Sequence, residues 1–86
     1  ADSPIFDLVF LNERGEVAEG ARSNIFVERD GVLLTPPIES GALPGVLRAD
    51  LLARGQAREV VLQPAALADG FWMGNALRGL IRVTLR

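Results

Sequence analysis

The sequence predicts an α+β fold, a mixed sheet built from hairpins with one main helix. Short apolar runs alternate with turn residues along most of the chain, which is typical of strands joined by tight connections. Arg29-Asp30-Gly31 is the strongest hairpin signal, because Asp-Gly readily adopts the positive φ angles of a two-residue turn. Helical spacing of apolar residues is clear only after Pro44-Gly45. We therefore expect about six or seven strands and one helix.

The first half of the chain predicts strands joined by hairpins. Residues 5–11 are apolar at both alternating sets of positions, which favours a strand in the interior of a sheet, covered on both faces. Asn12-Glu13-Arg14-Gly15 is turn chemistry and predicts a hairpin. Glu19-Gly20 should end the second strand, and Pro36-Pro37 should end the fourth, because proline cannot donate to a sheet. The expected strands cover residues 5–11, 16–18, 22–28 and 32–35.

The second half predicts a helix of about ten residues after Pro44-Gly45, ending at Gly55. Its apolar side chains should face the core while its charged side chains face away; the first set is Val46, Leu47, Leu51 and Leu52, the second Arg48, Asp50 and Arg54. Further strands are expected over residues 58–63, 71–73 and 80–86, the last half-buried. Residues 64–67 predict a single helical turn, and Gly74-Asn75 should break the strand at 71–73.

Composition excludes several classes of function. The net charge of −2 and the pI near 5.0 provide no basic surface for nucleic acid. No apolar run reaches the roughly 18 residues of a membrane span, and the N-terminal residues do not resemble a signal peptide, so we expect a cytoplasmic protein. Cys and His are absent, which leaves no thiolate or imidazole metal ligand. Lys and Tyr are absent as well.

One ordered set of motifs connects the two halves. Glu19 precedes Asn24-Ile25-Phe26, Thr35 follows a hairpin, and Leu43-Pro44-Gly45-Val46-Leu47-Arg48 opens the helix. This order closely resembles the signature of the class-IV pyridoxal-phosphate (PLP) enzymes, which include branched-chain and D-amino-acid aminotransferases and aminodeoxychorismate lyase. The resemblance implies that residues 1–86 are the C-terminal part of the large domain of a D-amino-acid-aminotransferase-like enzyme. It also implies a homodimer that binds a small amino-acid or amino-chorismate substrate.

The resemblance assigns roles to particular residues. Glu19 would face the pyridine nitrogen of PLP, and the amides of Val46 and Leu47, after Gly45, would bind its phosphate. Ser23 and Asn24 would hold the start of the strand and orient Glu19, and Asn75 would lie at the phosphate. Arg48 and Ala76 would lie near the substrate. These residues also have ordinary structural explanations. Glu19 could be an exposed carboxylate at a strand end, and Pro44-Gly45 could be a common start of a helix. Ser23, Asn24 and Asn75 could be turn residues, and Arg48 could pair with Glu39 or Asp50.

The class-IV enzymes hold PLP as a Schiff base on a Lys, and this chain has none. The Lys-bearing segment and the smaller domain are therefore expected to be missing, and the chain alone is expected to be inactive. The Asn75-Ala76-Leu77 segment resembles aminodeoxychorismate lyases, which form 4-aminobenzoate and pyruvate for folate biosynthesis, more than branched-chain aminotransferases. The leading hypothesis is thus a lyase. The alternatives are a class-IV aminotransferase for branched-chain or D-amino acids, a non-catalytic binding module, and a subunit that contributes half a site.

Overall fold

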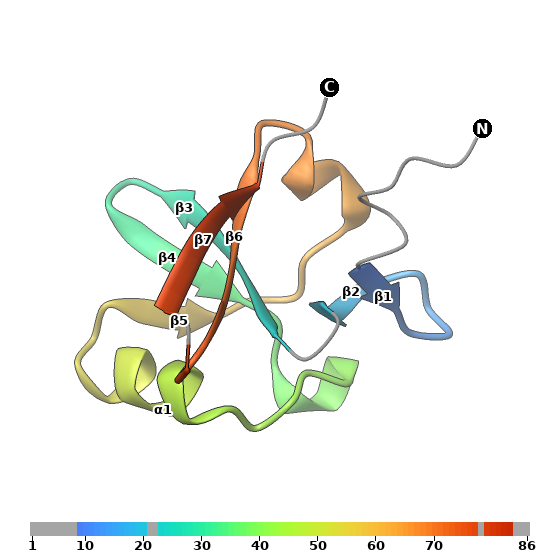
Figure 1. Cartoon of the computed structure of the whole chain (residues 1–86). Helices are drawn as coiled ribbons and strands as arrows, with labels where there is room; N and C mark the ends of the chain where they lie inside the picture. Colours follow the sequence, from blue (N-terminus) through green and yellow to red (C-terminus); the bar gives the residue numbers. More distant parts are fainter. Residues whose placement is uncertain (1–8, 21–22, 78, 84–86) are drawn as a thin grey trace.

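A computed structural model describes residues 9–20, 23–77 and 79–83 (Figure 1). Within these residues there are short strands, one α-helix and two 3₁₀ turns; the strands, the helix and the turn at 64–67 were predicted, whereas the turn at 38–40 was expected to be a loop. The elements are β1 (Val9–Leu11), β2 (Val17–Gly20), β3 (Asn24–Arg29), β4 (Val32–Thr35), η2 (Ile38–Ser40), α1 (Val46–Ala53), β5 (Ala57–Glu59), η3 (Pro64–Leu67), β6 (Phe71–Asn75) and β7 (Gly79–Val83).

The strands form a mixed five-stranded sheet of order β5-β4-β3-β6-β7 and a two-stranded sheet of β1 and β2. The pair β4 and β5 is parallel and the other pairs are antiparallel. A parallel pair needs a crossover connection, and η2 and α1 provide it. Beside this crossover, β3 pairs with a strand from the end of the chain, β6, so the two halves share one sheet.

The β3–β4 hairpin confirms the strongest turn prediction. Asp30 and Gly31 have φ angles of 53° and 80°, the positive pair that a two-residue hairpin turn requires. Asp tolerates this left-handed region better than most residues, and Gly adopts it without steric cost.

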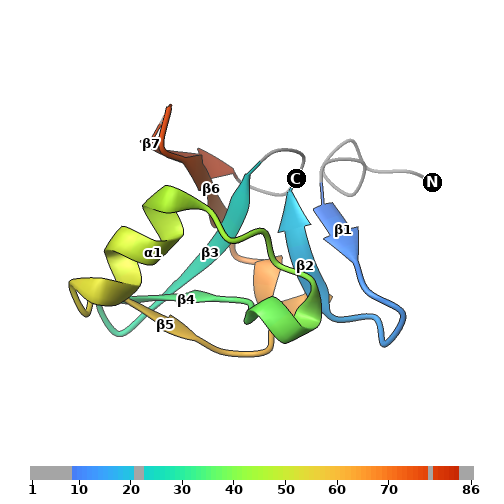
Figure 2. The same ribbon diagram turned by 90° about the horizontal axis from the view of Figure 1, so that it is seen from below.

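Helix α1 covers one face of the five-stranded sheet, as Figure 2 shows. The buried residues of this face are Phe26, Leu51 and Ala57, with Leu33, Leu47, Leu52, Trp72 and Leu80 packed against them. The opposite face packs against the β1–β2 hairpin and the segment around η3; its buried residues are Val9, Val17, Ile25, Val27, Leu62, Leu67 and Phe71. Successive residues of β3 therefore alternate between two apolar clusters, and β3 lies in the centre of the fold.

The prediction of an interior strand over residues 5–11 was wrong for the part that the structure describes. β1 begins at Val9 among the described residues and pairs with β2 in a separate two-stranded sheet. Val9 is buried, but Phe10 and Leu11 are 52% and 45% exposed. Although both alternating sets of positions in this segment are apolar, other parts of the described chain cover only one face of β1. Residues 5–8 lie outside the described residues.

Three strand boundaries also differ from the predictions. β5 occupies Ala57–Glu59, not residues 58–63, because the parallel pairing with β4 ends there and Val60 and Val61 are exposed. β2 includes Glu19-Gly20, and β6 continues through Gly74-Asn75, since both pairs remain in register with a neighbouring strand. β7 is Gly79–Val83, and the last three residues of the predicted strand over 80–86 lie outside the described residues.

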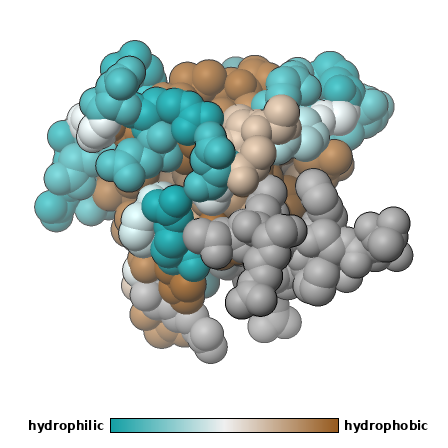
Figure 3. Space-filling model, turned by 90° about the horizontal axis from the view of Figure 1, so that it is seen from above, coloured by the Kyte–Doolittle hydropathy of each residue, from teal (hydrophilic) through white to brown (hydrophobic). Residues whose placement is uncertain are grey.

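Some large apolar side chains remain on the surface. In Figure 3, hydrophilic residues gather at two opposite ends of the face seen from above, with apolar residues between them. Val46 and Leu77 are the most exposed large apolar residues of the described chain, at 73% and 89%. They lie in the first turn of α1 and just after β6.

Candidate functional site: the start of helix α1

Several of the predicted site residues meet where α1 begins. Asn24, at the start of β3, lies opposite Gly74 near the end of β6. Leu47 of α1 packs over the same place, since a Cβ atom on Gly74 would lie 3.0 Å from the Leu47 Cδ2. In Figure 2 the start of α1 and the β6–β7 connection lie at the same end of the sheet. The fold thus brings Asn24, Leu47 and the end of β6 together.

The first turn of α1 has free donor capacity that suits an anion. Gly45 is the N-cap residue, and it makes no side-chain capping hydrogen bond. The first turn contains no acidic residue, and the first N–H groups of any helix lack an intrahelical partner. The Gly45 carbonyl already accepts from the Ala49 amide at 3.0 Å, so the helix is well formed from its first turn. The amides of Val46 and Leu47 are therefore available at the positive end of the helix dipole.

Asn24 fixes the chain that leads into this helix, residues 43–47, which we call the α1 turn. The Asn24 side chain is buried, and its Nδ2 donates to the Leu43 carbonyl at 2.9 Å. Its Oδ1 lies so close to the position of a Cβ atom on Gly45 that the two atoms would clash. Asn24 therefore acts on the α1 turn; the predicted contact with Glu19 remains a prediction.

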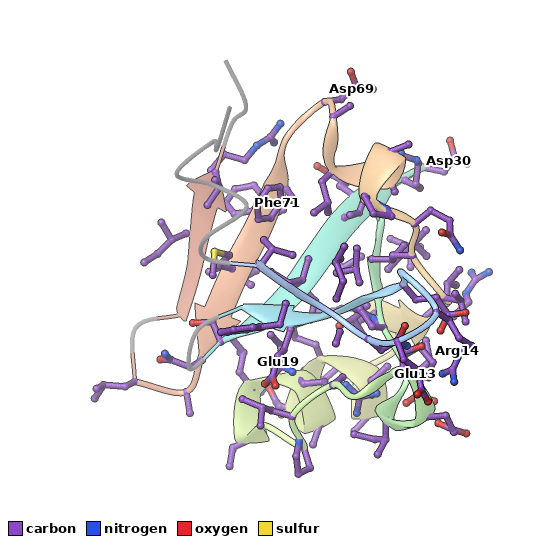
Figure 4. All side chains as sticks on the ribbon, turned by 90° about the vertical axis from the view of Figure 1, so that its right-hand side faces the viewer. Glu13, Arg14, Glu19, Asp30, Asp69 and Phe71 are labelled. Atoms are coloured by element: carbon purple, nitrogen blue, oxygen red, sulfur yellow. The ribbon has the colours of Figure 1, made fainter. Side chains whose placement is uncertain are left out.

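Glu19 lies in β2, where it pairs with Phe10 of β1 and is partly buried. Figure 4 shows its side chain directed from β2 toward the side of the molecule that carries α1, whereas Glu13 and Arg14 lie at the other end of the same hairpin, in the turn between β1 and β2. Ser23 is partly buried and immediately precedes β3. The cofactor roles of Glu19 and Ser23 stay predictions.

Asn75 and Ala76 lie at the end of β6 and the turn that follows it. The Asn75 Oδ1 accepts a hydrogen bond from the Leu77 amide at 3.0 Å, a local contact of the kind that shapes Asx turns. Ala76 and Leu77 are exposed. The segment is thus open to a ligand, and the predicted phosphate contact of Asn75 and substrate contact of Ala76 stay predictions.

The helical pattern predicted that Arg48 faces away from the core, and this prediction was wrong. Arg48 is only 5% exposed, whereas Val46, which was expected to be buried, is 73% exposed. The Arg48 guanidinium pairs with Glu59 of β5 and donates to the Pro36 carbonyl at 3.2 Å, instead of pairing with Glu39 or Asp50. The first turn of α1 is therefore rotated so that its third residue points into the protein. The helix is also shorter than expected, at 8 residues.

Sequence reasoning missed two contributors. Gly74 allows Leu47 and the β7 backbone to approach β6 closely: a Cβ there would lie 2.8 Å from the Gly79 carbonyl oxygen. A glycine within an apolar strand is the signal that indicates such an approach. Glu59 was missed because nothing in its local sequence shows that it meets Arg48.

A polar network ties the β1–β2 hairpin to η2, just before the α1 turn. The Glu16 Oε1 accepts from the Asn12 Nδ2 at 2.9 Å, from the Arg14 Nε at 3.2 Å and from the Ser40 hydroxyl at 3.2 Å. The hydrogen bond from Asn12 is the largest cause that lowers the pKa of Glu16 below its ordinary value of 4.5. Burial opposes it as the next largest effect, and Arg14 and Ser40 lower the pKa further. These contacts connect the two-stranded sheet to the loop that carries the site.

Other sites are not evident in residues 9–20, 23–77 and 79–83. These residues contain no group of acidic, His or Cys side chains that could hold a metal ion. None of their helices is both long and apolar enough to cross a membrane.

Sequence comparison identifies the family. The sequence pattern of the amino-transferase class IV family matches residues 2–85. The branched-chain-amino-acid aminotransferase of Escherichia coli K12 is 39% identical over 74 residues, which are 78% of this chain and 24% of that protein. The aminodeoxychorismate lyase of Bacillus subtilis 168 is 30% identical over 90 residues, 96% of this chain and 31% of that protein. The chain therefore belongs to the class IV aminotransferase family and spans about a quarter to a third of the length of these relatives.

Solved structures agree with the fold. A "putative amino-acid aminotransferase" from Mesorhizobium loti matches 91% of this chain and 39% of its own, with 47% identity and a TM-score of 0.84. The branched-chain aminotransferase of Thermobaculum terrenum, solved in its PLP form, matches 87% of this chain and 27% of its own, with 31% identity and a TM-score of 0.74. The predicted class-IV fold is confirmed. An uncapped helix start beside a glycine fits the phosphate of the cofactor that the family implies.

Proposed function

We propose that this chain is the C-terminal part of the large domain of a PLP-dependent enzyme, and that the α1 turn binds the cofactor phosphate. The observation that carries the proposal is the uncapped start of α1, which Asn24 braces through Leu43. Backbone N–H groups at a helix start bind phosphate well because they combine unpaired donors with the helix dipole. The Schiff-base Lys and the second wall of the pocket would come from a segment beyond this chain.

Each residue of the site has a limited task in this proposal. The Val46 and Leu47 amides would donate to the phosphate, and Asn75 would add a side-chain donor. Glu19 would hold a proton on the ring nitrogen of PLP, since a carboxylate beside that nitrogen favours its protonated form. Bound PLP supplies an electron sink for a substrate carbanion. The exposed Ala76 and Leu77 would border the substrate.

The first candidate reaction is that of 4-amino-4-deoxychorismate lyase, which releases 4-aminobenzoate and pyruvate. The Asn75-Ala76-Leu77 segment favours it, and the Bacillus subtilis lyase, which aligns with 96% of this chain, is consistent with it. Loss of a proton and of pyruvate leaves an aromatic ring, and aromatisation drives the step.

The second candidate is an aminotransferase for branched-chain or D-amino acids. The Escherichia coli branched-chain enzyme supports it, at 39% identity over 74 residues. Such an enzyme needs the same electron sink but also a 2-oxo acid as the acceptor of the amino group. The two candidates therefore differ in co-substrate and product. In either case we expect a homodimer.

The test uses the complete protein that contains this chain. Aminodeoxychorismate is supplied without any 2-oxo acid, and 4-aminobenzoate and pyruvate are measured. Equal formation of both products supports the lyase. Absence of both, together with transfer from a branched-chain or D-amino acid to 2-oxoglutarate, supports the aminotransferase. If the protein shows neither activity and does not bind PLP, the proposal is contradicted and a non-catalytic binding module is favoured.

A further inference from the structure

The ion pair between Arg48 and Glu59 is unusual in its surroundings. The Arg48 side chain is 7% exposed, whereas that of Glu59 is 45% exposed. The buried Arg48 Nε has no hydrogen-bond partner within the described part of the chain. Burying a charged side chain costs free energy, and an unsatisfied buried donor adds to that cost. A well-packed apolar residue at position 48 would avoid both costs, so stability alone does not explain an arginine here.

The position of Arg48 in the helix suggests another reason. Arg48 is the third residue of α1, directly after the two residues whose amides face the proposed phosphate. A cation in the first turn also opposes the helix dipole, so this arginine is unfavourable for the helix itself. Its Nη2 atom contacts Glu59 at the end of β5 and the carbonyl of Pro36, directly after β4. The pair therefore links the phosphate end of α1 to the parallel edge of the sheet.

Two other contacts fix the same turn from other directions. Asn24 holds the Leu43 carbonyl from β3, and Leu47 packs over Gly74 of β6. Arg48 provides the third link, to β4 and β5. Without it, the first turn of α1 would be held only from β3 and β6 and could rotate about its axis, moving the Val46 and Leu47 amides. Donor groups that bind a phosphate must keep their direction, and misplacement of about 1 Å is costly.

We propose that Arg48 and Glu59 are positioning residues, which orient the Val46 and Leu47 amides toward the phosphate of PLP. This inference rests on the proposed function, and it replaces the substrate contact that the family resemblance suggested for Arg48. Neither side chain need touch the ligand.

The test compares PLP with pyridoxal, which lacks the phosphate. Dissociation constants of both are measured by equilibrium dialysis for the complete protein and its Arg48→Met, Arg48→Lys and Glu59→Gln variants, at a temperature where each is folded. Arg54→Met is the matched control, because Arg54 follows the same helix and makes an exposed ion pair with Asp50 at 3.1 Å. The readout is the ratio of the two constants, which isolates the contribution of the phosphate.

We expect Arg48→Met to lower the preference for PLP over pyridoxal about tenfold, Glu59→Gln to lower it less, and Arg48→Lys to restore part of it. Arg54→Met should leave the ratio unchanged. A role confined to stability would lower the melting temperature and leave the ratio alone, and that result would overturn the inference. If Arg48→Met does not fold, Glu59→Gln decides, because the Glu59 side chain is 45% exposed and its replacement by Gln disturbs the core less. A wild-type protein that binds PLP no better than pyridoxal would overturn the proposed function itself.

Discussion

The carboxamide of Asn24 occupies the space that a side chain on Gly45 would need. The same group donates to the Leu43 carbonyl at 2.9 Å, so it both holds the α1 turn and excludes a side chain from it. Gly45 has a φ of −72° and a ψ of 152°, which any residue adopts. The requirement for glycine at this position therefore comes from Asn24 and not from the backbone.

We predict that Gly45→Ala destabilises the protein by about 1–3 kcal/mol, because the new methyl group must displace the Asn24 side chain. Asn24→Ala should cost about 1 kcal/mol, because the Leu43 carbonyl loses the hydrogen bond from the Asn24 side chain and keeps only the one from the Gly45 amide at 2.8 Å. The double variant should be destabilised by less than the sum of the two single variants, because the methyl group at position 45 no longer clashes with the Asn24 side chain. Urea unfolding of the four proteins measures this coupling. Strictly additive effects would show that the two residues do not compete for space.

Gly74→Ala should destabilise the protein more than Gly79→Ala. A Cβ at Gly74 would lie 2.8 Å from the Gly79 carbonyl oxygen and 3.0 Å from Leu47, so strands and helix must separate, at a cost of about 3 kcal/mol. Gly79 has a φ of 72° but open space around it, so alanine there costs only backbone strain of about 1–2 kcal/mol. Thermal unfolding compares the two variants. An equal loss in both would argue against close packing of α1 on β6.

The pH dependence of stability should include a contribution from Glu16. Its pKa in the folded protein lies below 4.5, so Glu16 stabilises the fold above about pH 4.5, and this stabilisation is lost as the pH falls through the folded-state pKa. Glu16→Gln should therefore make the free energy of unfolding depend less on pH in this range. Asn12→Ala should raise the titration midpoint of Glu16, because it removes the main stabilising hydrogen bond. A carboxyl midpoint at or above 4.5 in the unaltered protein, measured by carbon NMR, would contradict this account.

Glu19→Gln in the complete enzyme should leave the fold intact and lower turnover by at least about a hundredfold, because a preorganised electrostatic contact to the cofactor is lost. Glu19→Asp should also be impaired, through distance. Glu28→Gln is the control, since Glu28 is an exposed carboxylate on β3, the next strand along the chain. The measurement is steady-state turnover with whichever substrate the unaltered enzyme converts in the test of the two candidate reactions, and unchanged turnover in Glu19→Gln would exclude the role.

Local chemistry was sufficient to predict much of the fold. The Asp30-Gly31 turn, the strand at Val32–Thr35 and the turn at Pro64–Leu67 follow from residues within a few positions of each other. The extent of β5 did not, because the parallel partner β4 decides where the strand ends. The last residue pair is Thr35 with Glu59, and after the hydrogen bond from the Val60 amide to the Thr35 carbonyl the chain leaves the sheet, although Val60 and Val61 are apolar. Pairing between two strands that are separated in the sequence by a helix depends on the whole fold and not on local sequence.

The sequence also predicted only part of the candidate site. The start of α1 could be located from Pro44-Gly45, and the structure places Asn24 beside it. The burial of Arg48 could not be predicted, because a charged residue is normally exposed and its partner Glu59 lies on a different element. The role of Gly74 was misread as a strand end, since a glycine can either break a strand or admit a close neighbour.

The most direct test of the central claim is a crystal structure of the complete protein grown with PLP. The account predicts a phosphate that accepts hydrogen bonds from the Val46 and Leu47 amides, with the Glu19 carboxylate at the ring nitrogen. A PLP phosphate bound elsewhere, with the first turn of α1 unoccupied, would contradict it.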